Sequence, residues 1–263
     1  MTTGTRWIST LAVAAIVASP VHALQACHAA SGPRVRPLVE LFTSEGCDSC
    51  PPADRWLSAQ FPAAAGDADP IALAFHVDYW DRLGWTDRFA SADYTQRQYD
   101  AMRANRATFV YTPQVLLQGR DLRWQDGAAA AAVRTAALAQ ARAVITVDAT
   151  VADAAIAVRL DASMADRTAK GDARLFVAYA DSGLVSDVKS GENRGKRLVH
   201  DHVVRALTST DAADAAGRIR TTLNLTRPRE AGSAPMLVVF VQRLSTGDVL
   251  QSLALPLDGC HSP

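Results

Sequence analysis

The sequence lacks a surplus of charge of either sign, because 27 Lys and Arg residues balance 27 Asp and Glu residues to a formal net charge of zero. A neutral chain has no overall electrostatic attraction for nucleic acid or for an anionic lipid surface. Outside the N-terminus it also lacks the apolar run of about 20 residues that a membrane-spanning helix needs. We therefore expect no nucleic-acid partner and no membrane span in the mature protein.

One apolar run, at the N-terminus, is typical of a signal peptide. Arg6 supplies a positive charge, residues 7–18 are mostly apolar, and Ala23 ends a stretch with small residues at the cleavage positions. Cleavage after Ala23 predicts that residues 1–23 are a signal peptide and that the mature protein is periplasmic or secreted. In an alternative reading, residues 24–27 form a degenerate lipobox and Cys27 carries a lipid.

Cysteine is scarce, with four residues in the chain, and such usage in an exported protein fits an oxidising compartment. Cys47 and Cys50 are close enough in sequence to pair with each other. This pairing leaves Cys27 and Cys260 at opposite ends of the mature chain, and the termini of compact proteins are often close. We expect a structural Cys27–Cys260 disulfide, with two unpaired thiols as the alternative.

The paired cysteines lie in the most informative stretch, residues 38–54, which reads LVELFTSEGCDSCPPAD. Residues 38–42 have the composition of a buried strand, and the two prolines after Cys50 fit the first turn of a helix. The positive end of a helix dipole stabilises a thiolate, so two thiols at this corner are suited to disulfide exchange. Cys47, nearer the turn and more exposed, is the candidate attacking thiolate, with Cys50 as the resolving thiol.

A second buried-strand pattern, residues 71–77, is followed by polar and aromatic side chains. If it runs parallel to the first strand, its end opens at the edge where the cysteines lie, and ligands bind at that edge in open α/β sheets. The candidate residues of this cleft are Glu45, Asp48, His76, Asp78, Tyr79 and Trp80. The two carboxylates beside Cys47 disfavour its thiolate. The alternative is a structural insertion whose tryptophans cover the sheet edge.

The rest of the chain divides at residue 142. Residues 91–105 and 128–142 are expected to be helices, and 115–118 a short strand after Thr112-Pro113. From residue 143 onward, several short alternating runs predict an antiparallel sandwich. The expected organisation is an N-terminal extension (24–36), a first domain (37–142) and a β-rich C-terminal domain (143–263).

Three motifs taken together resemble a secreted thioredoxin-like family of unknown function. They are VELFTSEGCDSCPPAD at residues 39–54, FHVDYWD at 75–81 and YTPQ at 111–114. The resemblance implies an α/β thioredoxin-like domain followed by a mostly antiparallel β-sandwich-like domain. It also implies a cis peptide bond before Pro113, which packs against the dithiol, with Thr112 beside it. It implies no substrate.

A polar segment, Asn193 to Arg205, matches a further motif of the same family. His200 and His202 alternate within it, so both side chains could share one face and bind a metal. No third ligand is visible, and a solvated hairpin or a surface that docks on the first domain is favoured.

The sequence thus predicts a thiol–disulfide oxidoreductase that acts through Cys47, Cys50 and Pro113 on an exported protein or a small thiol or disulfide, without a cofactor. One alternative is a non-catalytic binding module in which Cys47–Cys50 is a structural disulfide. Another is a copper carrier, because soft thiolates select Cu(I). A copper carrier needs a third ligand, such as His76 or His200, near the sulfurs.

Overall fold

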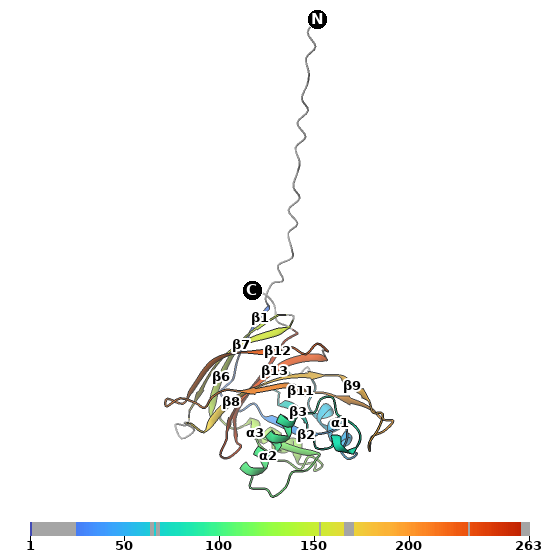
Figure 1. The fold of residues 1–263 in the computed structure, drawn as a ribbon. Helices are drawn as coiled ribbons and strands as arrows, with labels where there is room; N and C mark the ends of the chain where they lie inside the picture. Colours follow the sequence, from blue (N-terminus) through green and yellow to red (C-terminus); the bar gives the residue numbers. More distant parts are fainter. Residues whose placement is uncertain are drawn as a thin grey trace.

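The computed structural model describes residues 1, 25–63, 66, 69–152, 154–165, 171–230 and 232–258 (Figure 1). Apart from Met1, the predicted signal peptide lies outside this part of the chain. The expected Cys27–Cys260 pairing cannot be followed either, because Cys260 lies outside it as well. No helix among the described residues is long and apolar enough to cross a membrane.

Strands dominate the regular structure. The first half of the chain forms β1 (Gln25–Ala30), β2 (Leu38–Thr43), α1 (Pro51–Gln60), β3 (Ile71–His76), the 3₁₀ turn η1 (Asp81–Leu83), α2 (Ala92–Ala104), β4 (Gln114–Leu117), β5 (Arg120–Asp121) and α3 (Ala129–Ala137). The second half forms β6 (Ala143–Val151), β7 (Ala155–Met164), β8 (Ala173–Ser182), β9 (Leu184–Asp187), β10 (Arg197–His200), β11 (Val203–Ser209), β12 (Arg218–Thr226), β13 (Ser233–Arg243) and β14 (Val249–Pro256).

The main element is an eight-stranded sheet in the order β14-β13-β8-β11-β3-β2-β4-β5. β2 and β3 are parallel, which is the condition that the predicted cleft required, and β11 pairs in parallel with β3 through Val203 and Ala74. Strands from both sides of residue 142 therefore share one sheet. The predicted fold class, an α/β thioredoxin-like domain followed by a β-sandwich-like domain, is wrong. The described chain is a mostly β structure, and β11 fills the edge of β3 that a separate first domain would leave open.

The buried strands follow from their composition. Every residue of β2 and of β3 is buried, which requires cover on both faces of the sheet and explains the continuous apolar runs. β6 instead alternates buried and less buried residues, since only one of its faces meets the core. α2 begins after Ser91, whose side chain accepts the Asp93 N–H, so the predicted helix start is confirmed.

The eight-stranded sheet curls until its two ends meet. Val249 N–H donates to Gln118 O at 3.3 Å, and Gln118 Nε2 donates to Val249 O at 3.1 Å, which joins the turn after β4 to the start of β14. The inner, concave face carries an aromatic and aliphatic core that includes Phe42, Phe75 and Phe240. α2 packs on this side through Tyr94, while α1 and α3 do not.

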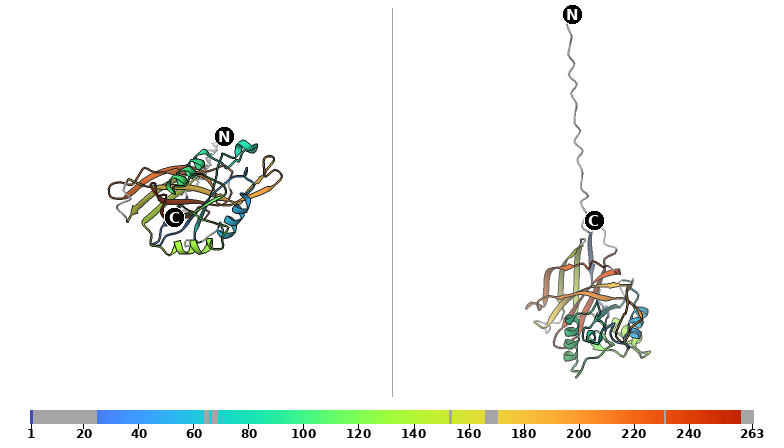
Figure 2. Two further views of the ribbon diagram at one scale, coloured as in Figure 1. Left: turned by 90° about the horizontal axis from the view of Figure 1, so that it is seen from below. Right: turned by 45° about the vertical axis from the view of Figure 1, so that its right-hand side comes forward.

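The outer face of the same sheet is covered by two different layers. Over β8, β13 and β14 lies an antiparallel four-stranded sheet in the order β1-β6-β7-β12, and the two sheets enclose a second core. Over β2, β3 and β4 lie α1 and α3, which contribute Leu57 and Val133 to a third core. Figure 1 places the four-stranded sheet at one end of the molecule and the helices at the other. In the left view of Figure 2, α2 and α3 lie on opposite sides of the strands between them.

Candidate functional site

The two cysteines lie at the corner between β2 and α1, and they form a disulfide, as predicted. After β2 the chain turns, with Cys47 N–H donating to Ser44 O at 3.2 Å and Cys50 N–H donating to Cys47 O at 3.3 Å. α1 then begins with Cys50 as its N-cap and with Pro51 and Pro52 in its first turn. The prolines fit there because the first turn of a helix has no internal partner for its N–H groups.

Both cysteines are sealed from solvent, with 0% exposure each. The two residues between them, Asp48 and Ser49, are exposed and form the outer surface of the corner. The hydroxyl of Ser49 lies 3.4 Å from Cys47 Sγ. The exposed Cys47 expected from the sequence is therefore not found, because another part of the chain covers the corner.

Residues 189–196, which we name the covering segment, lie over this corner. Asn193 is fully buried, and its side-chain amide donates one hydrogen bond to Glu45 O and one to Cys47 O, each of 2.8 Å. Lys196 Nζ in turn donates to Asn193 Oδ1 at 2.7 Å. Both N–H groups and the oxygen of the Asn193 side chain thus have hydrogen-bond partners. The contact between Asn193 and the corner is therefore specific.

Side chains provide the other contacts of the covering segment. Asp48 N–H donates to Glu192 Oε2 at 3.3 Å, and the Ser190 hydroxyl donates to Gly84 O. The backbone hydrogen bonds of the segment close within residues 188–196. The backbone hydrogen bonds of the covering segment are therefore separate from the strand pairing of the large sheet.

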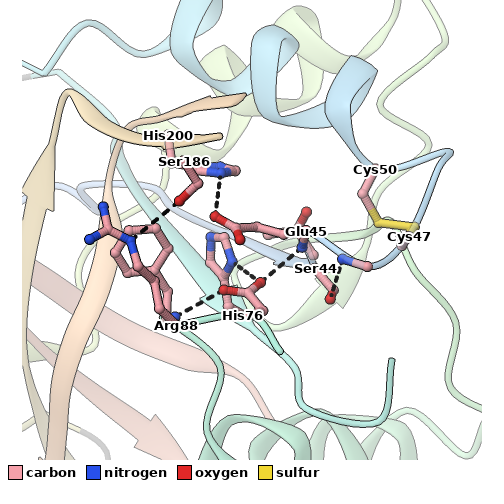
Figure 3. A network of polar contacts seen from close by, with 12 residues as sticks. Ser44, Glu45, Cys47, Cys50, His76, Arg88, Ser186 and His200 are labelled. Atoms are coloured by element: carbon pink, nitrogen blue, oxygen red, sulfur yellow. Dashed lines mark hydrogen bonds and ion pairs between the residues drawn. A yellow bond between two sulfur atoms is a disulfide. The ribbon is translucent and has the colours of Figure 1, made fainter. Parts of the chain in front are cut away.

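A cluster of buried ionisable side chains lies beside the corner (Figure 3). Its members are Glu45, Asp54, His76, Asp87 and His200, each no more than 8% exposed. Asp87 Oδ2 lies 2.7 Å from His76 Nδ1 and also accepts the Glu45 N–H at 2.8 Å. The cluster therefore ties the end of β3 to the turn that precedes Cys47.

Glu45 is held on the side away from the disulfide. Trp85 Nε1–H donates to Glu45 Oε2 at 2.7 Å. His200 Nε2 lies 3.2 Å from Glu45 Oε1, an ion-pair distance, although neither ring nitrogen of His200 makes a well-directed hydrogen bond. Figure 3 shows the Glu45 side chain pointing toward His200 rather than toward the sulfurs. Asp54, in the first turns of α1, accepts the Thr43 hydroxyl at 2.8 Å.

The pKa values of four side chains in the cluster are shifted, those of His76 and Asp54 upward and those of Asp87 and Glu45 downward. Burial lowers the pKa of His76, but the adjacent Asp87 carboxylate outweighs burial and raises it. The same contact holds the pKa of Asp87 below its usual value despite burial. Burial also opposes ionisation of Glu45, yet contacts led by His200 keep its pKa lowered, whereas burial prevails at Asp54 and raises its pKa. The cluster therefore combines a His76–Asp87 ion pair with one carboxyl, Asp54, that resists ionisation.

Trp80 connects two of the predicted motifs. The Nε1–H of Trp80 donates to Thr112 Oγ1 at 2.8 Å. Trp80 also packs against Gly46, because a Cβ atom added to Gly46 would lie only 2.9 Å from the Cβ of Trp80. The Thr112–Pro113 peptide bond is cis, as expected. Trp80 thus links the turn before Cys47 to the loop that carries Pro113.

Other predicted cleft residues point elsewhere. Asp78 accepts the Thr95 hydroxyl at 2.6 Å, and the Tyr79 hydroxyl donates to Gln98 Oε1 at 3.2 Å, so both side chains contact α2. His200 is the last residue of β10, whereas His202 lies in the turn between β10 and β11. The Nε2 atom of His202 lies 2.6 Å from Phe61 O. The two histidines therefore do not share a site.

From the sequence, Asn193 was only part of a polar motif, His200 was a candidate metal ligand, and Asp54 had no predicted role. Two features of the sequence could have pointed to the buried cluster. Asp54 lies within the cysteine motif, and Asp87 follows the second predicted strand. No comparable signal connected Asn193 to Cys47. Among the described residues, no group of three or more His, Cys, Asp or Glu side chains has the arrangement of a metal site.

Two solved structures resemble the chain. An X-ray structure of a protein from Agrobacterium tumefaciens is 28% identical, with a TM-score of 0.58, over 86% of this chain and 96% of that one. HBP35 of Porphyromonas gingivalis is 14% identical, with a TM-score of 0.61, over 88% of this chain and 77% of that one, which is a likeness of fold alone. No curated protein matches the chain.

A match to a protein family also covers the site. Residues 38–242, from the start of β2 into the last residues of β13, match the model of one protein family. They include the disulfide corner, the buried cluster and the covering segment. The chain therefore belongs to the family of proteins of unknown function named DUF1223.

Proposed function

We propose that the chain is an exported thiol–disulfide exchange protein whose reacting groups are Cys47 and Cys50. The observation that carries this proposal is the position of the disulfide, which spans only two residues and closes at the N-terminal end of α1. The dipole of a helix favours a thiolate at that end. The Ser49 hydroxyl, 3.4 Å from Cys47 Sγ, is placed to donate to a thiolate on Cys47.

The stabilisation of such a thiolate is modest. Pro51 and Pro52 carry no N–H, and the N–H groups of Ala53 and Asp54 already donate to Cys50 O. This leaves mainly the dipole, which contributes about 0.3–1 kcal/mol at an exposed helix end. A weakly stabilised dithiol form lowers the reduction potential, so the pair acts more as a reductant than as a strong oxidant.

In the exchange, a substrate thiolate attacks Cys47 Sγ, a mixed disulfide forms, and the electron pair of the broken bond leaves on Cys50 Sγ. A second substrate thiolate then attacks the substrate sulfur of the mixed disulfide and releases Cys47 as a thiolate. The substrate loses two electrons and becomes a disulfide, while the cysteine pair gains them. The reverse sequence, started by Cys47, reduces a substrate disulfide.

This reaction requires the covering segment to leave the corner, because neither sulfur is reachable while Asn193 is docked. The contacts of Asn193, Glu192 and Ser190 with the corner are the ones that must break. The exchange is therefore a gated reaction, in which opening precedes attack.

Capture of glutathione tests the assignment of the two roles. Cys50→Ser leaves Cys47 as a single thiol, which should form one mixed disulfide with oxidised glutathione in the folded protein, detected by intact mass. Cys47→Ser, the matched control, should react far more slowly. Adducts that form on neither variant until urea is added would contradict the proposal.

Export rests on residues 1–23 and is also part of the proposal. Mass spectrometry of the protein recovered from cells should find Leu24 as the first residue, with the protein in the periplasmic or secreted fraction. Recovery of the protein in the cytoplasmic fraction with its leader uncleaved would contradict export.

A second candidate is a non-catalytic binding module with a structural Cys47–Cys50 disulfide. The complete burial of both cysteines favours it. A structural disulfide resists reduction and has a potential below about −300 mV, so a redox titration separates the two candidates. We do not propose a copper carrier, because no group of described side chains offers the ligands for one.

A further inference from the structure

The four-stranded sheet ends in a strand, β12, that is paired on one side only. In the order β1-β6-β7-β12, β12 pairs with β7 from Arg218, opposite Ser163, to Thr226, opposite Ala155. No strand of the described chain pairs with the other side of β12, which we name the open edge. Figure 1 places β12 in the part of the molecule away from α1, so the open edge is separate from the disulfide corner.

Two hydrogen bonds at the ends of β12 show which backbone groups point toward the open edge. Met164 N–H donates to Gly217 O at 2.9 Å, and Arg227 N–H donates to Ala154 O at 3.1 Å. In an antiparallel pair, residues that bond to the neighbouring strand alternate with residues whose N–H and C=O groups point the other way. Odd-numbered residues of β12 therefore bond to β7, and even-numbered residues present their backbone groups at the open edge.

The turn before β12 occupies the first of these even-numbered residues. Arg218 N–H donates to Asp214 Oδ1 at 2.9 Å, and Arg218 O accepts the Asp214 N–H at 2.9 Å. The backbone groups of the open edge that have no partner within the described chain are those of Arg220, Thr222, Asn224 and Thr226. Such a row of free N–H and C=O groups is a template for another strand.

β12 lacks the features that protect an edge strand from pairing. Residues 221–226 contain no charged residue and no proline, and the pairing of β12 with β7 has no register shift that would indicate a bulge. Natural proteins protect edge strands with charges, prolines, bulges or short length. A hollow of about 490 Å³ lies beside the end of β12, with Thr226 and Pro228 in its wall, so the described chain leaves room there.

The open edge is complementary to a second copy of itself. If a two-fold axis passes through Leu223, Thr222 lies opposite Asn224 of the second copy, and Arg220 lies opposite Thr226. Each of these pairs exchanges two backbone hydrogen bonds, so every free group of the edge is used. No two like charges face each other. On the axis, the two half-buried Leu223 side chains meet as a non-hydrogen-bonded pair, in which side chains lie closest.

We propose that β12 pairs antiparallel with β12 of a second copy of the chain, which joins the two four-stranded sheets into one continuous sheet. The partner is a second copy because the strand matches itself in hydrogen bonding, in charge and at the apolar Leu223. The proposal does not depend on thiol exchange, since neither the disulfide corner nor the covering segment takes part in the contact.

Sedimentation velocity of the oxidised protein tests the pairing. Thr222→Pro removes an N–H of the open edge but none of the hydrogen bonds to β7, and edge strands tolerate proline at such a position. Thr222→Ala keeps the N–H and is the matched control. We expect the wild type and Thr222→Ala to pass from monomer to dimer between about 5 and 200 µM. The dissociation constant of Thr222→Pro should be about ten-fold higher or more, because each copy loses one donor.

A wild-type protein that stays monomeric over this range, or equal dimerisation of folded Thr222→Pro, would overturn the proposal. Cross-linking decides the matter if Thr222→Pro does not fold. Leu223→Cys places two thiols on the axis, where the Cα atoms lie about 4.5 Å apart, a separation that a disulfide spans. Mild oxidation should therefore give a covalent dimer, detected by intact mass. Thr146→Cys, on the central strand β6, is the control, and absence of the Leu223→Cys dimer or equal cross-linking of Thr146→Cys would overturn the pairing.

Discussion

The side chain of Asn193 donates a 2.8 Å hydrogen bond to the backbone oxygen of Cys47, which lies 146 residues earlier in the sequence. The same amide donates to Glu45 O, so one buried side chain binds two backbone carbonyl groups, those of Glu45 and Cys47, in the turn that carries the disulfide. The exposure of the cysteines therefore depends on a residue from the second half of the chain. The contact between Asn193 and Cys47 is the gate of the proposed exchange.

Asn193→Ala should accelerate reduction of the Cys47–Cys50 disulfide by dithiothreitol. The substitution removes two hydrogen bonds, each worth about 0.5–1.5 kcal/mol net, from the closed state. Because 1.4 kcal/mol corresponds to a factor of ten, we expect reduction to be roughly ten-fold faster or more. The rate is measured by quenching aliquots with a thiol-alkylating reagent and counting adducts by mass.

Asn224→Ala is the matched control for this experiment, since Asn224 is exposed on β12, far from the disulfide in the fold. Its reduction rate should equal that of the wild-type protein. Equal rates in Asn193→Ala and the wild type, with both folded, would remove Asn193 from the gating role.

Asp54→Asn should change how stability depends on pH. Burial raises the pKa of Asp54, so the folded state binds a proton more tightly than the unfolded state does. Stability therefore falls as pH rises from the ordinary pKa of an aspartate toward the raised value in the folded protein. Asparagine keeps the oxygen that accepts the Thr43 hydroxyl but does not ionise.

The unfolding free energy of Asp54→Asn, relative to the wild type, should consequently increase as pH rises through this window and then level off. Urea unfolding at several pH values between about 4 and 8 measures the difference. Asp126→Asn, at an exposed position before α3, is the matched control for the substitution. A flat difference for Asp54→Asn would mean that its carboxyl is not destabilised by burial.

The reduced protein should remain folded. A disulfide that closes a loop of only four residues stabilises a protein by about 2 kcal/mol in the chain-entropy model. Because dithiothreitol would also reduce the expected Cys27–Cys260 bridge, the comparison is made between the oxidised wild type and the Cys47→Ala/Cys50→Ala variant, whose unfolding free energies in urea should differ by about this amount. Unfolding of the whole chain in this variant would mean that the disulfide is essential to the fold, which favours the structural role.

Gly119→Ala should destabilise the closure of the sheet. Gly119 has a φ of +80°, and a Cβ there would lie 1.9 Å from Gly247 O in the loop before β14. Overpacking and an unfavourable φ together should cost roughly 2–4 kcal/mol of unfolding free energy. Gly84, with a φ of +96° and nothing within 4 Å of the added Cβ, is the control. Gly84→Ala should lose only the part of the unfolding free energy that is due to the unfavourable φ. Equal losses of unfolding free energy in the two variants would contradict the close contact between Gly119 and Gly247.

Local patterns predicted the disulfide corner well. The apolar run before Cys47 formed β2, the prolines after Cys50 formed the first turn of α1, and the second apolar run formed a parallel neighbour, β3. Each of these features depends on residues close together in the sequence. This is why the composition of residues 38–54 and 71–77 was sufficient to predict the two strands and the helix start, whereas the parallel pairing of β2 with β3 entered only as a condition.

The long-range contacts could not be read from the sequence. Val203 of β11 pairs with Ala74 of β3, and this single pairing converts the two predicted domains into one sheet and makes the fold-class prediction wrong. Asn193 reaches Cys47 by a side-chain contact that no local pattern specifies. The burial of the disulfide, and hence the need for a gate, follows from the second contact.

The reduction potential of the Cys47–Cys50 pair tests the central claim most directly. Equilibration of the wild-type protein with defined ratios of reduced and oxidised dithiothreitol or glutathione, followed by alkylation and mass analysis, gives its midpoint. A gated exchange pair with a weakly stabilised thiolate should have a midpoint between about −300 and −230 mV. A midpoint below about −300 mV would contradict thiol exchange and make the disulfide structural.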